Sequence, residues 1–216
     1  MARPKSSRDW VHRHLNDPYV KRAQEDGYRS RAAYKLLEFN RREPLLKPGM
    51  TVIDLGSTPG GWSQVAAQIV GTKGKVIAID LLEMKAVPGV HFIHDDFSHG
   101  TGLNAVISAL GENNKANLVI SDMSPNLTGN RVTDQARLYA LCELAADFAV
   151  HFLKPNGIFL VKVFQGEGFE PYLKLLRQNF LKVATKKPDA SRDESRETYI
   201  IAKGIKQEAV ALNCNS

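Results

Sequence analysis

The sequence has only two cysteines among its 216 residues. Cys142 lies in a segment with helical periodicity, and Cys214 lies close to the C-terminal end. Two isolated cysteines indicate neither a disulfide framework nor a metal site, so we expect a metal-free protein in a reducing compartment, the cytoplasm. Disulfide-stapled secreted domains and zinc-finger proteins are therefore disfavoured.

Long hydrophobic runs are missing as well. No segment approaches the roughly 20 apolar residues of a membrane-spanning helix, and residues 1–8 lack the apolar centre of a signal peptide. We therefore expect a soluble protein with no membrane partner. Residues 1–8 are basic and small, which predicts a flexible tail, and residues 207–216 are predicted to be a disordered tail.

The bulk composition is that of a globular domain, with 43% hydrophobic and 24% charged residues. The length and the lack of repeats or linkers predict a single domain over residues 1–206, which we expect to be monomeric. The formal net charge is +6, which favours an anionic partner, with nucleic acid as the first candidate.

Short apolar runs alternate with helical patterns from residue 51 onward, which predicts an α/β fold with a mostly parallel, doubly wound sheet. Strands are predicted at 51–55, 75–80, 91–94, 117–121 and 157–164, and helices at 62–70, 103–110, 133–152 and 169–180. Two late strands, 181–187 and 198–203, are close enough in sequence to pair antiparallel. Earlier helices are predicted at about 9–27 and from an N-cap at Ser30 to about Arg41.

A glycine-rich turn joins the first strand to the next helix. It lacks the Gly-Lys-Ser/Thr of a phosphate-binding loop, and glycines 56, 60 and 61 miss the dinucleotide-binding spacing. Asp54, just ahead of Gly56, would repel a pyrophosphate but attract a cation. S-adenosylmethionine carries a sulfonium and an ammonium group, so the turn favours this cofactor over NAD or ATP. The alternative is an ordinary strand-to-helix turn, with Trp62 in the core rather than shielding a cofactor.

Carboxylates follow the second and third predicted strands, where a doubly wound sheet binds its ligands. Asp80 ends the second strand and is suited to accept hydrogen bonds from ribose hydroxyls, although it could also only cap its loop. After the third strand, either Asp95 or Asp96 could accept from an adenine amino group while Phe97 covers the ring. Alternation does not decide between the two, and a solvated acidic loop is a competing interpretation.

Candidate reactive groups follow the fourth strand and lie within the fifth. Asp122 follows the fourth strand, and Lys162 is embedded in an apolar run, where a lysine is costly unless it is partnered or functional. Burial or a nearby cation, for which Lys35 is a candidate, would favour a neutral amine that can act as a base. Glu197 is a candidate orienting acid, although Lys35 and Glu197 could equally be solvated surface residues.

The motifs together resemble those of the FtsJ/RrmJ family of ribosomal RNA large-subunit 2′-O-ribose methyltransferases, from about Arg8 to Lys203. The matching segments are 29–36, 54–64, 121–126, 161–169 and 187–197. The resemblance implies a Rossmann-like S-adenosylmethionine-dependent methyltransferase fold with one antiparallel strand near the C-terminus. Ser57 and Thr58 replace the usual Ala-Ala of the family, which bears on cofactor affinity.

The resemblance also implies roles for individual residues. A catalytic Lys-Asp-Lys-Glu tetrad falls on Lys35, Asp122, Lys162 and Glu197. The cofactor contacts fall on Gly60, Trp62, Asp80, Asp96 and Asp122, in addition to Asp54 and Gly56 in the turn, so Asp96 is favoured over Asp95. RNA contacts are expected at Arg8, Arg13, Lys21, Arg22, Arg29, Arg31 and Lys35, and at Lys186, Lys187, Arg192 and Arg196.

The implied reaction is the 2′-O-methylation of a ribose, expected to be a uridine, in large-subunit ribosomal RNA during ribosome maturation. One alternative is the same transfer to transfer RNA or to a messenger cap. Another is a non-catalytic RNA-binding assembly factor, although the sequence retains all four tetrad residues. A small-molecule methyltransferase is a third alternative, and the basic segments on both sides of the tetrad argue against it.

Overall fold

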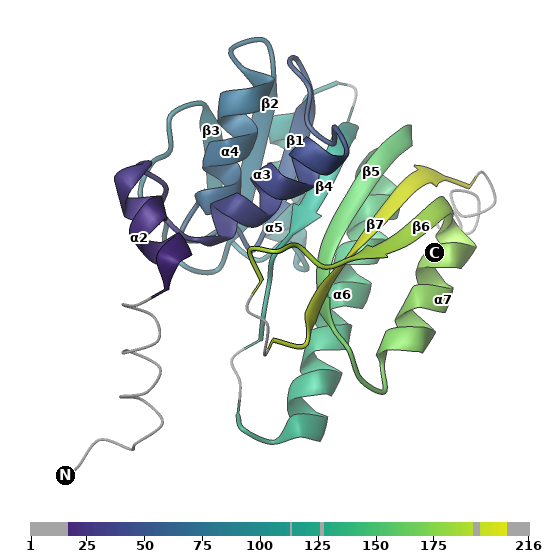
Figure 1. Cartoon of the computed structure of the whole chain (residues 1–216). Helices are drawn as coiled ribbons and strands as arrows, with labels where there is room; N and C mark the ends of the chain where they lie inside the picture. The colour runs from purple at the N-terminus through teal and green to yellow at the C-terminus, as the bar shows by residue number, and fades with distance from the viewer. Residues whose placement is uncertain (1–16, 113, 126–127, 192–194, 207–216) are drawn as a thin grey trace.

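The computed structural model describes residues 17–112, 114–125, 128–191 and 195–206. The described residues form a seven-stranded sheet with the order β3-β2-β1-β4-β5-β7-β6 (Figure 1). The strands are β1 (Thr51–Leu55), β2 (Lys75–Asp80), β3 (Val90–His94), β4 (Ala116–Ser121), β5 (Leu153–Phe164), β6 (Phe180–Lys186) and β7 (Glu197–Ile205). The two predicted tails, residues 1–8 and 207–216, lie outside the described residues.

The strand order creates a switch point between β1 and β4. The chain adds β2 and β3 on one side of β1 and then crosses back to place β4 on the other side, with all these pairings parallel. β7 runs antiparallel to both of its neighbours, β5 and β6. The prediction of a mostly parallel sheet with one antiparallel strand is therefore confirmed, and a ligand site is expected at the carboxyl ends of β1 and β4.

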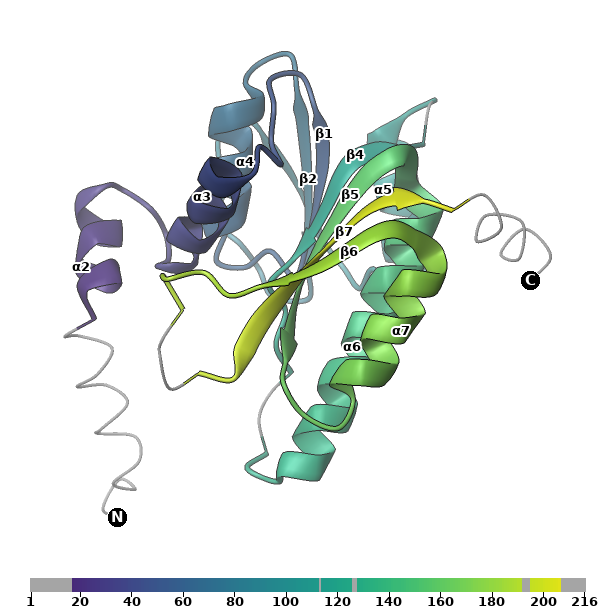
Figure 2. The same ribbon diagram turned by 45° about the vertical axis from the view of Figure 1, so that its right-hand side comes forward.

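Helices cover both faces of the sheet, as Figure 2 shows from the side. The helices are α2 (Pro18–Glu25), α3 (Ala32–Arg42), α4 (Gly61–Val70), α5 (Gly100–Leu110), α6 (Arg131–Phe152) and α7 (Phe169–Asn179). One apolar core lies between the sheet and α5, α6 and α7, and a second lies between the sheet and α3 and α4. Within the described ranges, no helix combines the length and apolar character that crossing a membrane requires.

The element boundaries differ from the sequence predictions at a few places. Ser30 is not a helix N-cap: α3 begins at Ala32 after Arg31, and Ser30 contributes its main-chain oxygen, which accepts from the Ala33 amide at 3.2 Å. Of the helix predicted at 9–27, the structure describes α2, whose N-cap Asp17 accepts from the Tyr19 amide at 3.0 Å. β5 begins at Leu153, four residues before the predicted start at Gly157.

Candidate active site

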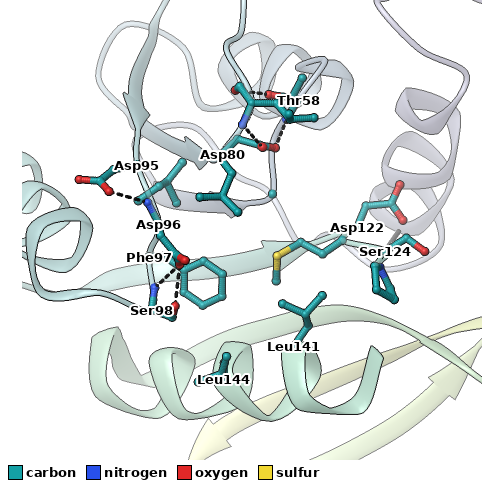
Figure 3. Close-up of a pocket in the computed structure, with 16 residues that line it drawn as sticks. Thr58, Asp80, Asp95, Asp96, Phe97, Ser98, Asp122, Ser124, Leu141 and Leu144 are labelled. Atoms are coloured by element: carbon teal, nitrogen blue, oxygen red, sulfur yellow. Dashed lines mark hydrogen bonds between the residues drawn. The ribbon is translucent and has the colours of Figure 1, made fainter. Parts of the chain in front are cut away.

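A cavity of about 540 Å³ opens at the predicted switch point (Figure 3). Its walls come from the loops that follow β1, β2, β3 and β4, and α6 closes one side with Leu141 and Leu144. In Figure 3 Asp80 lies opposite α6, whereas Asp96 and Asp122 lie on opposite sides of the cavity. The folding of a doubly wound sheet thus brings together three carboxylates that are far apart in the sequence.

Two glycines of the β1–α4 turn adopt backbone conformations that other residues rarely tolerate. Gly56 has a φ of +69°, and a β-carbon there would collide with the Met123 side chain. Gly60 has a φ of +102° and caps the N-terminus of α4, and a β-carbon there would lie 2.8 Å from the Met84 sulfur. Gly56 lines the cavity, whereas Gly60, a predicted cofactor contact, shapes the turn without lining it.

A smaller cavity of about 50 Å³ adjoins the first one. Gly56, Thr58 and Asp122 line both cavities, so the two are parts of one site. Asp54 and Trp62, both predicted cofactor contacts, line the smaller part, and the Trp62 indole donates to the Ala32 carbonyl at 2.7 Å.

Ser57 also lines the smaller cavity. Its hydroxyl is buried and has no hydrogen-bond partner among the described residues. An unpaired buried hydroxyl is costly, so a polar ligand group in this cavity would stabilise the site.

Asp54 is almost fully buried, with 1% of its surface exposed. The pKa of Asp54 is raised to about 7, chiefly by burial; the hydrogen bond from Ser63 opposes this rise, and the negative charges of Asp122 and Asp80 add to it. The Ser63 hydroxyl donates to the Asp54 carboxylate at 2.6 Å. Because a bound cation would stabilise the ionised carboxylate, the smaller cavity is suited to a positively charged group.

Asp80 connects the loops on two sides of the larger cavity. One carboxylate oxygen accepts from the Thr58 amide and the other from the Leu82 amide, each at 2.8 Å (Figure 3). A carboxylate oxygen has two acceptor positions, so each oxygen of Asp80 can also accept from a ligand hydroxyl. Both interpretations of Asp80, as a loop cap and as a ribose acceptor, are compatible with this geometry.

Asp95 and Asp96 differ in orientation. The Asp95 carboxylate accepts from the Asp96 amide at 2.7 Å and points away from Asp80 and Asp122 in Figure 3. The Asp96 carboxylate accepts from the amide and hydroxyl of Ser98, at 2.8 and 2.6 Å. Burial would raise the pKa of Asp96, but the bonds from Ser98 and His99 outweigh it and lower the pKa. Both aspartates line the cavity, and the assignment of an adenine contact to Asp96 stays a prediction.

Lys162 and Asp122 form an ion pair at the edge of the larger cavity. The Lys162 Nζ lies 3.2 Å from the Asp122 carboxylate and donates to the Asp122 carbonyl oxygen at 2.5 Å. Lys162 is buried, which agrees with its place in an apolar run of β5. Burial would raise the pKa of Asp122, but the charges of Lys162 and Lys35 and a hydrogen bond from Tyr199 lower it below its usual value.

Lys35 and Glu197 form a second ion pair, with 2.6 Å between the Lys35 Nζ and Glu197 Oε1. Tyr199 joins this pair to the first one. Its hydroxyl donates to the Asp122 carboxylate at 2.7 Å and accepts from the Lys35 Nζ at 2.9 Å. The four residues of the predicted tetrad therefore lie in one connected network.

Tyr199 was missed by the sequence analysis, although a signal for it existed. Residues two apart in a strand point to the same face, so Tyr199 on β7 faces the same way as Glu197. β7 also pairs Tyr199 directly with Lys162 of β5. Burial raises the pKa of Tyr199 well above its usual value, and the negative charge of Asp122 adds to this effect, so the hydroxyl keeps its proton and remains a donor.

Arg29 and Arg31 are two predicted RNA contacts, and their guanidinium groups make contacts within the protein. Arg29 donates to the carbonyl oxygens of Pro59, Lys85 and Ala86, at 3.3, 2.5 and 2.5 Å, and so links the β1–α4 turn to the loop between β2 and β3. Arg31 pairs with Asp17 and donates to the Ala190 carbonyl. Direct RNA contacts by these two residues stay predictions.

The other predicted RNA contacts are distributed around the site. Lys21, Arg22, Lys186, Lys187 and Arg196 are exposed, and Lys35 is buried in the network described above. Arg8, Arg13 and Arg192 lie outside the described residues.

The sequence is similar to those of known methyltransferases. The sequence profile of the FtsJ-like methyltransferase family matches residues 28–205. A Chromobacterium violaceum protein named ribosomal RNA large subunit methyltransferase E is 57% identical over 204 residues, which cover 94% of this chain and 99% of that protein. A Pseudomonas aeruginosa protein of the same name is 52% identical over 208 residues, which cover 96% of this chain and all of that protein.

The structure is also similar to solved structures of methyltransferases. The crystal structure of a Plasmodium falciparum protein described as a ribosomal RNA methyltransferase has a TM-score of 0.72 and 28% sequence identity, and the match covers 82% of this chain and 98% of that one. A Thermotoga maritima S-adenosylmethionine-dependent O-methyltransferase, at 16% identity and a TM-score of 0.53, shares the fold. The chain therefore belongs to the FtsJ-like methyltransferase family.

Proposed function

We propose that this protein transfers a methyl group from S-adenosylmethionine to the ribose 2′-hydroxyl of a uridine in large-subunit ribosomal RNA. The observation that carries the proposal is the network of Lys162, Asp122, Tyr199, Lys35 and Glu197 at the edge of the two-part cavity. The names of the relatives support ribosomal RNA as the substrate. In this proposal the protein acts in the cytoplasm as the ribosome matures.

The residues of the two-part cavity fit the cofactor. The ammonium group would lie near Asp54, and the Ser57 hydroxyl is available to the neighbouring carboxylate. Asp80 would accept from the ribose hydroxyls, and Asp96 with Phe97 would hold the adenine in the larger cavity. When bound, S-adenosylmethionine supplies a methyl group on a positively charged sulfur, from which it can pass to a nucleophile.

Alignment of the two substrates contributes much of the rate, because the transfer is an in-line displacement. Asp122 lines both parts of the cavity and also holds Lys162, so it lies between the cofactor site and the base. Lys162 accepts the proton of the 2′-hydroxyl when its amine is neutral. As the ammonium that pairs with Asp122, it instead donates to the hydroxyl oxygen and directs a lone pair toward the methyl group, and the proton is released to solvent. Lys35, Glu197 and Tyr199 position Asp122 and set the charge balance around it.

The proposal is tested first by cofactor selectivity and by label transfer. In calorimetry without added metal, we expect S-adenosylmethionine and S-adenosylhomocysteine to bind, and NAD and ATP not to compete. With methyl-labelled cofactor, we expect label in the RNA of undermethylated large ribosomal subunits and none in transfer RNA. Stronger labelling of transfer RNA than of the subunits would contradict the proposed substrate.

Replacing Asp80 with alanine is expected to weaken cofactor binding about ten- to hundredfold. The reason is the loss of hydrogen bonds to a charged group, which contribute about 1.5–3 kcal/mol. Calorimetry with S-adenosylhomocysteine measures the change, and Asp95→Ala is the matched control, because that carboxylate points away from the cavity centre. Equal affinities of the Asp80→Ala variant and the unaltered protein would remove the ribose contact from the account.

The pH dependence of cofactor binding tests Asp54. Its pKa of about 7 means that the carboxylate becomes ionised as pH rises through neutrality. An ammonium group binds the ionised form, so we expect affinity for S-adenosylmethionine to rise several-fold between pH 6 and pH 7.5, with proton release on binding. Calorimetry in two buffers of different ionisation enthalpy measures the protons released. The Asp54→Asn variant should lose both effects, and a variant that retains them would contradict the assignment.

A further inference from the structure

A second large cavity, of about 430 Å³, lies outside the cofactor site between α2, α3 and the turn at residues 189–190. It shares no lining residue with the two-part cavity. Figure 2 shows α2 on the outer side of α3, away from the sheet. The cavity is therefore separate from the two-part cavity.

The wall of this cavity combines three tyrosine rings with arginine side chains. The Tyr34 ring centre lies 5.6 Å from that of Tyr19 and 5.7 Å from that of Tyr28, in tilted and edge-on contacts. The Arg22 guanidinium lies 5.0 Å from the Tyr34 ring centre. Proteins recognise unpaired RNA bases by stacking them on aromatic rings and guanidinium planes, so the composition of this wall suits a nucleobase.

The charged groups around the cavity suit an RNA strand as well. Arg22 and Arg41 are exposed cations that can contact phosphates. The Asp26 and Asp189 side chains are 43% and 74% exposed, and they pair with Arg22 at 3.4 Å and with Arg42 at 2.8 Å. Each carboxylate has further acceptor positions, which can bind amino groups on a base edge. A free phosphate or an acidic peptide would meet these two carboxylates unfavourably, so the mixed charge favours a neutral base on a charged backbone.

Helix α3 contributes residues both to this cavity and to the network of Lys162, Asp122, Tyr199, Lys35 and Glu197. Tyr34 lines the cavity, and the next residue of α3, Lys35, belongs to the network. The Glu38 carboxylate accepts from the amides of Asp189 and Ala190, at 2.9 and 3.1 Å, which fixes the turn against α3. A strand that places its ribose at Lys162 therefore has a rigid second anchoring surface along α3.

We propose that this cavity binds an unpaired nucleobase of the substrate RNA, from a nucleotide that flanks the methylated one. This inference rests on the proposed function, because it assumes an RNA substrate. The base stacks on the tyrosine cluster and presents its amino group to the carboxylates at the rim. Its role is to anchor the substrate, so it contributes to RNA affinity and not to the chemical step.

The test compares Tyr19→Leu, which removes the half-buried ring, with Tyr19→Phe, which keeps it. Stacking contributes about 1–3 kcal/mol per base, so Tyr19→Leu should raise the KM for large subunits at least about fivefold. We expect kcat at saturating subunits and the affinity for S-adenosylhomocysteine to stay unchanged. Tyr19→Phe should behave like the unaltered protein, and thermal unfolding of both variants checks that they fold. Arg22→Gln removes the guanidinium that lies 5.0 Å from the Tyr34 ring centre and should raise the KM as well.

The outcomes separate this inference from the proposed function. If the unaltered protein fails to methylate the subunits, the proposed function fails. If it methylates them and both Tyr19→Leu and Arg22→Gln retain its KM, only the base-binding inference is overturned. Binding to protein-free ribosomal RNA is measured in parallel. A defect with intact subunits but not with protein-free RNA would assign the cavity to a ribosomal protein and would also overturn the inference.

Discussion

Replacing Lys162 with alanine is expected to slow methyl transfer by about 10²–10⁴-fold, the range for loss of a general acid–base group. Lys162 is a buried charge on β5 and is paired with Asp122, which lines both parts of the cavity. Affinities for S-adenosylhomocysteine and for large subunits should stay within a few-fold, because in the proposed mechanism the lysine acts on the reacting hydroxyl. Single-turnover methylation of large subunits at saturating cofactor measures the chemical step directly.

The Lys162→Arg variant distinguishes two possible actions of the lysine, which are to accept the hydroxyl proton or to donate a hydrogen bond to the hydroxyl oxygen. A guanidinium remains protonated and cannot accept a proton, so we expect no recovery of the rate. Lys203→Ala is the matched control. It removes a lysine of β7 from an ion pair with Glu43 at 2.5 Å, and Lys203 lines neither part of the two-part cavity. Near-normal rates in Lys162→Ala would leave alignment by Asp122 to explain catalysis.

RNA affinity is expected to fall by about 10³–10⁵-fold between 50 and 200 mM salt if six to ten phosphates are contacted. The physical reason is the release of counterions from the RNA when cationic side chains bind its phosphates. Filter binding of ribosomal RNA across a salt series measures the slope. Affinity that does not change with salt would contradict the electrostatic account.

Charge reversal tests where the RNA lies. Lys186 and Arg196 are exposed at the same edge of the sheet as the network of Lys162, Asp122 and Tyr199. Lys186→Glu and Arg196→Glu should each weaken RNA binding and reduce the salt slope by about one. Lys73→Glu, an exposed lysine in the turn before β2 at the opposite edge, should change neither. Equal effects from Lys73 and Lys186 would indicate non-specific attraction only.

The contacts that Arg29 makes within the protein change the result expected from its substitution. Because its guanidinium holds the β1–α4 turn against the loop between β2 and β3, at the proposed cofactor site, Arg29→Glu should weaken cofactor binding as well as RNA binding. From sequence alone, Arg29 is one cation in a basic segment. Its acceptors lie 30 to 57 residues away and are main-chain atoms, so no side-chain pattern marks them.

The sheet strands were predictable because their apolar runs are bounded by polar turns. β1 and β2 have the predicted bounds, Thr51–Leu55 and Lys75–Asp80. The first residues of β5 were missed because Lys154, Pro155 and Asn156 have the composition of a loop. In the structure this segment follows Leu153, which pairs with Ala116 across an irregularity in the register.

The site was predictable to the extent that carboxylates at strand ends meet at one edge of a doubly wound sheet. This rule brings Asp54, Asp80 and Asp122 together. It does not supply the orientation of a side chain, which distinguishes Asp95 from Asp96, or a link made by one hydroxyl, such as that of Tyr199. Those features depend on packing between elements that are distant in the sequence.

The central claim is that the transferred methyl group ends on a ribose oxygen of large-subunit RNA. The most direct measurement supplies methyl-labelled S-adenosylmethionine to undermethylated large subunits, digests the RNA to nucleosides and identifies the labelled one by mass spectrometry. The account predicts 2′-O-methyluridine with the unaltered protein and a loss of that product with Lys162→Ala. Label on a base, or equal label with and without Lys162, would contradict it.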